Sequence, residues 1–190
     1  MEAEDTNFEK HLRSILHQPP YVVDMVGPTK LLEHLYIGNY TDAYACERLR
    51  DLGITHVINC AAFSQSDENP YDEESSVVAY KQFRANDDDS YDMMQHYEDA
   101  EEMINNAKES GGKALVHCAM GINRSGIIVV AYIMVNENMS LLETVKLVKS
   151  KRGTLLCNRG FQKQLIAFAR KRGLLDDLNK EKTDENANSA

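Results

Sequence analysis

A strand pattern and a helix pattern meet in KALVHCAMGINRSGIIVVAYIMV, residues 113–135. KALVH (113–117) is short and apolar and follows a pair of glycines, as expected of a buried strand. Residues 124–136 form a longer run that is apolar on every side, so we expect a buried helix there despite its β-branched residues. A strand, a tight turn and a helix are the parts from which sheets with parallel strands are built.

The same alternation of strands and helices extends along the rest of the chain. Strand patterns occupy residues 31–38, 54–60 and 77–83, helix patterns occupy residues 6–17, 41–52, 93–107, 140–152 and 161–172, and residues 61–76 have the composition of a loop. This order predicts an α/β fold in a single domain, with a central, mainly parallel sheet and helices on both of its faces. Because such sheets bind ligands at the carboxyl ends of their strands, we expect the functional site at the turn after KALVH.

The composition fits a soluble globular protein, with 43% hydrophobic and 27% charged residues in a chain of 190. The longest purely apolar run, residues 127–135, is too short for the roughly 20 residues that cross a membrane. The amino end is acidic and polar, unlike a secretory signal, so we expect a cytoplasmic or nuclear protein. A net charge of −9 argues against nucleic acid as a partner, and the four cysteines contain no CxxC pair that would suggest a zinc site.

The turn carries a chemical motif. HCAMGINRSG, residues 117–126, places five residues between Cys118 and Arg124, with Gly121 among them. This spacing is common by chance, but His before the Cys, Gly three residues after it and Ser after the Arg together reduce the chance to on the order of 10⁻⁵. Five residues between a strand and a helix can curl so that successive backbone amides point inward and bind an anion, helped by the positive end of the helix. The planar guanidinium of Arg124 can hold two phosphate oxygens at once.

This arrangement predicts a nucleophilic cysteine. An anion-binding loop also stabilises a thiolate, so we expect the pKa of Cys118 to lie well below its usual value and the sulfur to be ionised at neutral pH. Ser125 can donate its hydroxyl to the sulfur and ease its departure, and His117 is expected to fix the loop through hydrogen bonds. The phosphate itself would be bound by Ala119, Met120, Gly121, Ile122, Asn123 and Arg124. No metal or cofactor is required, and the alternative is an inert buried cysteine.

HCAMGINRSG resembles the active loop of the dual-specificity protein phosphatases, within the cysteine-based protein tyrosine phosphatase superfamily. Further similar segments are LYIGN (35–39), LGITHVINCAA (52–62), AND (85–87) and NRGFQKQL (158–165). The likeness is greatest to the small atypical members, which consist of the catalytic domain alone. It implies a protein tyrosine phosphatase-like fold with a twisted sheet in residues 28–174, after an N-terminal helix and linker (1–27) and before a disordered polar tail (175–190).

The resemblance also implies a general acid. The family places an Asp on a mobile loop about thirty residues before the catalytic Cys, and here ANDDDSYDMM offers Asp87, Asp88 and Asp89. Asp87 follows the family-like Ala-Asn pair, so we favour it, with Asp88 next. A positioned acid of this kind is worth about 10²–10⁴ in rate, because it protonates an otherwise poor leaving group. The remaining aspartates are expected to form an ordinary solvated turn.

The substrate class follows from the resemblance as well. It implies hydrolysis of phosphotyrosine, phosphoserine and phosphothreonine in proteins through a phosphocysteine, with mitogen-activated protein kinases as partners to test. Lipid-directed relatives usually carry basic residues inside the loop, and this loop has none. Asn123 before Arg124 is slightly similar to RNA 5′-triphosphatase relatives. A catalytically weak scaffold that binds phosphoproteins is the alternative from another functional class.

The chain departs from the family in one segment. Cys157 stands where the family often has Pro, and one residue is inserted after Arg152, so we assign no role to Asn158. Both Cys60 and Cys157 are expected to be buried core residues.

Overall fold

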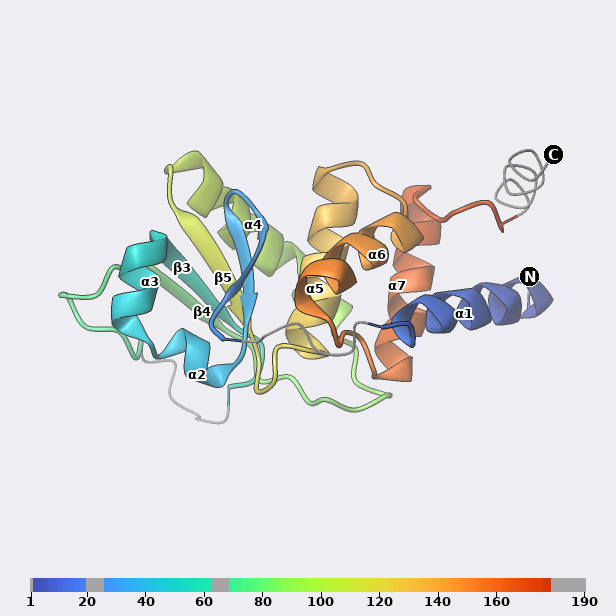
Figure 1. The fold of residues 1–190 in the computed structure, drawn as a ribbon, viewed down its shortest axis with the longest axis horizontal. Coiled ribbons are helices and arrows are strands. Elements are labelled where there is room, and N and C mark those ends of the chain that lie inside the picture. The colour runs from blue at the N-terminus through green and yellow to red at the C-terminus, as the bar shows by residue number, and fades with distance from the viewer. Residues whose placement is uncertain (1, 20–25, 63–68, 179–190) are drawn as a thin grey trace.

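The computed structural model describes residues 2–19, 26–62 and 69–178 of the chain (Figure 1). In chain order its elements are α1 (Glu2–Leu16), β1 (Thr29–Leu32), β2 (Leu35–Gly38), α2 (Tyr40–Ala43), α3 (Cys46–Leu52), β3 (Ile54–Asn59), β4 (Ala79–Gln82), the 3₁₀ helix η1 (Met94–His96), α4 (Tyr97–Glu109), β5 (Lys113–His117), α5 (Arg124–Asn136), α6 (Leu141–Arg152) and α7 (Arg159–Arg172).

The strands form one mixed sheet in the order β1-β2-β5-β3-β4. Strands β2, β5, β3 and β4 pair in parallel, whereas β1 at the edge is antiparallel to β2, so the prediction of a mainly parallel sheet is confirmed. In the central strand β5, His117 lies opposite Gly38 of β2 and opposite Asn59 of β3. Three parallel strands therefore end at one edge of the sheet, where Cys118 follows.

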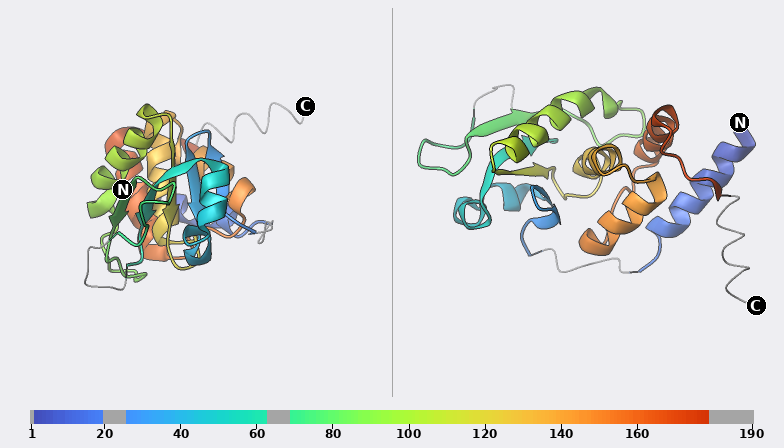
Figure 2. Two further views of the ribbon diagram at one scale, coloured as in Figure 1. Left: turned by 90° about the vertical axis from the view of Figure 1, so that its left-hand side faces the viewer. Right: turned by 90° about the horizontal axis from the view of Figure 1, so that it is seen from above.

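Helices cover both faces of the sheet, as predicted. Leu115 of β5 is buried in a cluster with residues of α2 and α3, whereas its neighbours Ala114 and Val116 are buried against α4 and α5. This alternation follows from the two-residue period of a strand. Figure 1 places α1, α6 and α7 at the opposite end of the molecule from α3 and β4, and Figure 2 shows the same separation from above.

Helix α5 is buried along nearly its whole length, from Arg124 to Met134. The sheet lies on one side of it, and α6 and α7 pack on others. Such surroundings explain why the helix is apolar all round, and they confirm the predicted span of residues 124–136.

Several predicted boundaries differ from those observed. The strand expected over 31–38 is two antiparallel strands, because the polar pair Glu33-His34 turns the chain between β1 and β2. The helix expected over 41–52 is interrupted at Tyr44 and Ala45, and its first part starts with a capping box between Asn39 and Asp42. The loop expected over 61–76 lies partly outside the described residues, at 63–68.

The amino and carboxyl segments pack on the domain. Helix α1 contacts α6 and α7, and Leu12 is fully buried. Asp176 accepts hydrogen bonds from the Ser140 hydroxyl and, at 2.9 Å, from the backbone amide of Leu142. The second bond gives a partner to an amide at the start of α6 that has none within the helix. The prediction of a disordered tail is therefore wrong for residues 175–178, while 179–190 lie outside the described residues.

In the described part of the chain, no helix combines the length and apolar character needed to cross a membrane.

Candidate active site

The loop after β5 curls at the centre of the sheet edge. The amide of Tyr40, at the start of α2, donates to the carbonyl of Ala119 at 3.2 Å, which ties the loop to the end of β2. Gly121 has a φ of +68°, and a β-carbon there would lie 2.6 Å from the carbonyl oxygen of Gly38. Only glycine fits this conformation and this close approach.

The sulfur of Cys118 is surrounded by donors. The amide of Gly121 lies 3.2 Å from Sγ and the hydroxyl of Ser125 lies 3.3 Å from it. Burial raises the pKa of the thiol, since Cys118 is only 2% exposed. The Ser125 hydroxyl and the amides of Ser125, Ile122 and Gly121 outweigh that effect and hold the pKa below its usual value. The predicted direction of the shift thus has a structural cause.

Arg124 begins α5 beside this sulfur. Its Nη1 donates to the carbonyl of Ala85 at 3.1 Å, which fixes the side chain against the chain segment before Asp87. Its Nε is buried and makes no hydrogen bond to the described residues. A buried guanidinium donor of this kind is suited to binding an oxyanion.

Of the three candidate acids, Asp87 is the one whose carboxylate contacts the loop. The side-chain Nδ2 of Asn123 lies 3.1 Å from each of its oxygens, and the side-chain Nδ2 of Asn158 lies 3.0 Å from Oδ1. Nε of Arg124 lies 4.0 Å from Oδ2. The side chain is 32% exposed, so a leaving group could reach it from solvent.

The other two aspartates turn elsewhere. Asp88 accepts hydrogen bonds from the amide and hydroxyl of Ser90, which lower its pKa. The backbone carbonyl of Asp89 packs on Gly160, where a β-carbon would lie 1.9 Å from that oxygen. Both side chains are exposed. Asp88 and Asp89 therefore form the solvated turn expected of such a run.

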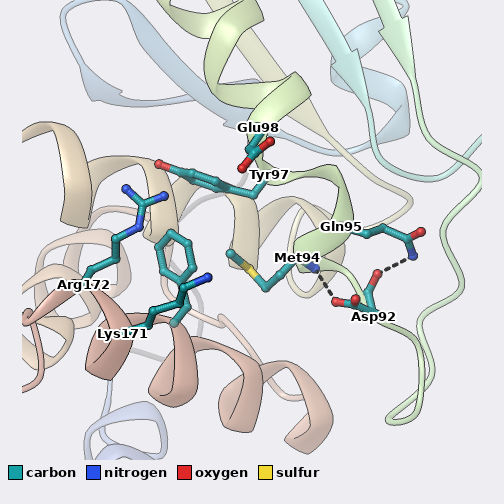
Figure 3. Close-up of a pocket in the computed structure, with 8 residues that line it drawn as sticks. Asp92, Met94, Gln95, Tyr97, Glu98, Lys171 and Arg172 are labelled. Carbon is teal, nitrogen blue, oxygen red and sulfur yellow. Dashed lines mark hydrogen bonds between the residues drawn. The ribbon is translucent and has the colours of Figure 1, made fainter.

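A separate hollow lies between η1 and α7 (Figure 3). It is lined by Asp92, Met94, Gln95, Tyr97, Glu98, Phe168, Lys171 and Arg172. The guanidinium of Arg172 stacks over the Phe168 ring, 4.9 Å from its centroid. None of the lining residues belongs to the loop 118–124. This hollow is therefore separate from the candidate active site at the sheet edge.

Comparison with known proteins identifies this loop. Residues 35–171 match the family model described as the catalytic domain of dual specificity phosphatases. The chain belongs to the dual-specificity phosphatase family. It is 41% identical to human Dual specificity protein phosphatase 26 over 138 residues, which cover 72% of this chain but only 64% of that relative. Among solved structures, human DUSP28 superposes with a TM-score of 0.67 at 27% identity, covering 82% of this chain and 97% of that one, and DUSP15 with a TM-score of 0.67 at 30% identity, covering 75% and 86%.

The segment that departs from the family pattern packs directly behind the loop. Leu156 adopts a φ of +51°, unusual for a branched residue, and this left-handed residue accommodates the irregular segment. Its amide donates to the carbonyl of Ile122 at 3.1 Å, and its own carbonyl accepts from Gln162 at 2.7 Å. Both polar groups are satisfied, so the departure leaves the loop supported.

Asn158, which the sequence left without a role, belongs to the site. Its Oδ1 caps α7 by accepting from the amide of Phe161 at 3.0 Å, its backbone amide donates to Oδ1 of Asn123 at 3.2 Å, and its side-chain amide contacts Asp87. The signal was the family-like Asn-Arg-Gly-Phe segment, but the irregular residues before it hid where it would pack.

The neighbouring cysteines differ in position. Cys60 follows β3, is fully buried, and donates its amide to the carbonyl of His117 at 2.8 Å. Cys157 is exposed, so the expectation that it lies in the core is wrong. Cys157 immediately precedes Asn158, the residue that caps the first turn of α7.

Proposed function

We propose that this chain is a cysteine-dependent phosphatase that hydrolyses phosphotyrosine, phosphoserine and phosphothreonine in proteins. The observation that carries the proposal is the sulfur of Cys118, which lies 3.2 Å from the Gly121 amide and 3.3 Å from the Ser125 hydroxyl, donors that lower its pKa despite burial. A lower pKa increases the fraction of thiolate, which is the nucleophilic form of a cysteine. The names of the relatives, dual specificity protein phosphatases, support the same reaction.

The reaction would proceed in two steps. The thiolate of Cys118 attacks phosphorus in line, the P–O bond to the substrate breaks, and Asp87 protonates the departing oxygen. Arg124 and the amides of residues 119–124 bind the remaining phosphate oxygens. Water then attacks the phosphocysteine while Asp87 takes up its proton, and the S–P bond breaks to release phosphate. The Ser125 hydroxyl, 3.3 Å from the sulfur, stabilises the thiolate that leaves.

The side chains of the loop favour phosphoproteins among phosphate esters. Ala119, Met120, Ile122 and Asn123 are uncharged, and Met120 is 61% exposed, so no basic side chain of the loop is available for additional phosphates of a lipid headgroup. Mitogen-activated protein kinases are the first phosphoproteins to test, and the cytoplasm and nucleus are the compartments in which to look for the chain.

The test is hydrolysis of p-nitrophenyl phosphate by the purified chain and by Asp87→Asn, Asp88→Asn and Asp89→Asn. We expect turnover by the parent chain and a loss of about a hundredfold or more in the Asp87 variant alone. The other two variants are matched controls in the same turn, and we expect them to stay within about threefold of the parent, as surface substitutions do. No hydrolysis by the parent chain would favour the phosphoprotein-binding scaffold instead.

A second prediction concerns the residues that hold the acid. Asn158→Ser keeps a capping hydroxyl for α7 but removes the amide that contacts Asp87. We expect about a tenfold loss of kcat on a phosphoserine peptide, whose poor leaving group depends most strongly on a proton, and a smaller loss on p-nitrophenyl phosphate, whose leaving group depends on it less. Equal losses on both substrates would contradict the assignment. In the Asp87→Asn background the Ser substitution should have no further effect.

A further inference from the structure

A buried cation lies behind the loop. Arg152 is the last residue of α6, and its side chain is fully buried. Its Nε donates to the carbonyl of Gly121 at 3.2 Å, its Nη2 to the carbonyl of Met120 at 3.3 Å, and its Nη1 to the hydroxyl of Thr29 at 3.0 Å. All three nitrogens of one guanidinium are thus used, two of them on the loop.

The two loop carbonyls belong to particular peptide units. In a trans peptide the carbonyl and the N–H point in opposite directions. The carbonyl of Met120 shares its peptide unit with the amide of Gly121, and the carbonyl of Gly121 shares its unit with the amide of Ile122. The Gly121 amide lies 3.2 Å from Sγ of Cys118, and the Gly121 and Ile122 amides are both among the hydrogen bonds to that sulfur.

We propose that Arg152 is a positioning residue for the nucleophile: it binds the carbonyls of Met120 and Gly121 and thereby keeps the amides of Gly121 and Ile122 turned toward the sulfur. The inference rests on the proposed function and deepens it. It assigns the orientation of the loop to a side chain that touches neither the sulfur nor the substrate.

The packing leaves no room for another donor in this place. A β-carbon on Gly121 would lie 2.3 Å from Nη2 of Arg152, so the guanidinium fits directly against the loop backbone. Arginine keeps its charge in proteins, and a charge this deeply buried is costly unless its donors are satisfied. Burial lowers the pKa of Arg152, and the charges of Asp42 and Cys118 oppose this effect, which couples the guanidinium to the thiolate. Lysine carries all of its N–H donors on one nitrogen, so it cannot reproduce the fork that reaches both carbonyls.

The test is the rate at which iodoacetamide alkylates Cys118 as a function of pH. Mass spectrometry of the peptide that contains Cys118 separates this reaction from alkylation of the exposed Cys46 and Cys157. The variants are Arg152→Met and Arg152→Lys. The matched control is Lys151→Met, because the adjacent Lys151 donates to the carbonyl of Leu31, outside the loop, at 2.6 Å.

We expect the midpoint of alkylation to rise by about one pH unit or more in Arg152→Met, by less in Arg152→Lys, and not at all in Lys151→Met. The plateau at high pH should stay the same, because the sulfur is fully ionised there in the parent chain and in the variant. Inhibition of p-nitrophenyl phosphate hydrolysis by orthovanadate should weaken about tenfold in Arg152→Met, since the same amides bind the oxyanion. A merely structural role would move neither the midpoint nor the inhibition constant of the folded protein.

An unchanged midpoint in Arg152→Met, with the buried Cys60 still protected from iodoacetamide, would overturn the inference. If Arg152→Met exposes Cys60, the domain has opened, and Arg152→Lys decides: a midpoint equal to that of the parent chain overturns the inference, and a raised one supports it. The alkylation midpoint of the parent chain distinguishes a failure of the proposed function from a failure of the role of Arg152. An ordinary thiol midpoint in the parent overturns the proposed function, whereas a low midpoint that Arg152 does not influence overturns only the role of Arg152.

Discussion

Cys60 and Cys118 follow neighbouring parallel strands and are almost equally buried, at 0% and 2% exposure. Burial raises the pKa of Cys60 well above its usual value, and the nearby Cys118 raises it further, against the opposing charge of Arg124. At Cys118 the same burial is outweighed by donors from Ser125, Ile122 and Gly121. Burial alone therefore raises the pKa of a thiol and leaves it inert. Hydrogen-bond donors directed at an equally buried sulfur lower its pKa and make it a nucleophile.

Replacing each sulfur tests this comparison most strongly. Cys118→Ser should lower kcat by more than about 10⁴-fold, because the hydroxyl is not ionised at neutral pH. Cys60→Ala should leave kcat within about threefold of the parent and lower the free energy of unfolding by about 1 kcal/mol, the cost of a small cavity. Steady-state hydrolysis of p-nitrophenyl phosphate and urea denaturation measure the two effects. A Cys60→Ala variant as inactive as Cys118→Ser would break the comparison.

Removing one donor should move Cys118 part of the way toward the state of Cys60. Ser125→Ala deletes the hydroxyl 3.3 Å from the sulfur and leaves the loop amides in place. We expect the midpoint of Cys118 alkylation to rise by about one pH unit and kcat to fall about tenfold, because the departing thiolate loses a hydrogen bond. Rapid-quench measurement should reveal accumulation of the phosphocysteine. An unchanged alkylation midpoint would assign the lowered pKa to the amides alone.

The smallest effect on chemistry concerns His117, whose carbonyl links the two strand ends through the amide of Cys60. Burial lowers the pKa of His117 to about 4 from 6.5, against a hydrogen bond to the Cys118 backbone. Between these two values the unfolded chain binds more protons than the folded one, so the free energy of unfolding rises with pH there. His117 accounts for roughly 3 kcal/mol of this increase in the free energy of unfolding.

Urea denaturation across this pH range measures that share as a difference between the parent chain and His117→Gln. Burial also lowers the pKa values of His34, His56 and His96, so both proteins should lose stability as the pH falls. The variant should lose less. Identical slopes in the two proteins would mean that His117 is solvated and titrates normally.

Much of the fold could be predicted because its signals are local. The span of α5, the strand at 113–117 and the helix pattern at 140–152 all depend on residues within a few positions of one another. The last of these begins with a capping box of Ser140 and Glu143. Breaks inside an amphipathic pattern were less visible. The pattern at 41–52 continues through Tyr44 and Ala45, but the helix does not, because α2 begins at its own capping box near the end of β2.

Local spacing identifies the residues that can carry the chemistry. Cys118, Gly121, Arg124 and Ser125 place a sulfur, a tight turn, a guanidinium and a hydroxyl within one strand–loop–helix unit. The distant side chains that support this unit are set by the packing of the folded chain. Asn158 reaches Asp87 across 71 positions of the chain, and Arg152 reaches Gly121 across 31. Such contacts depend on how α6 and α7 pack behind the loop, and local spacing shows the apolar face of each helix but not which faces pack together.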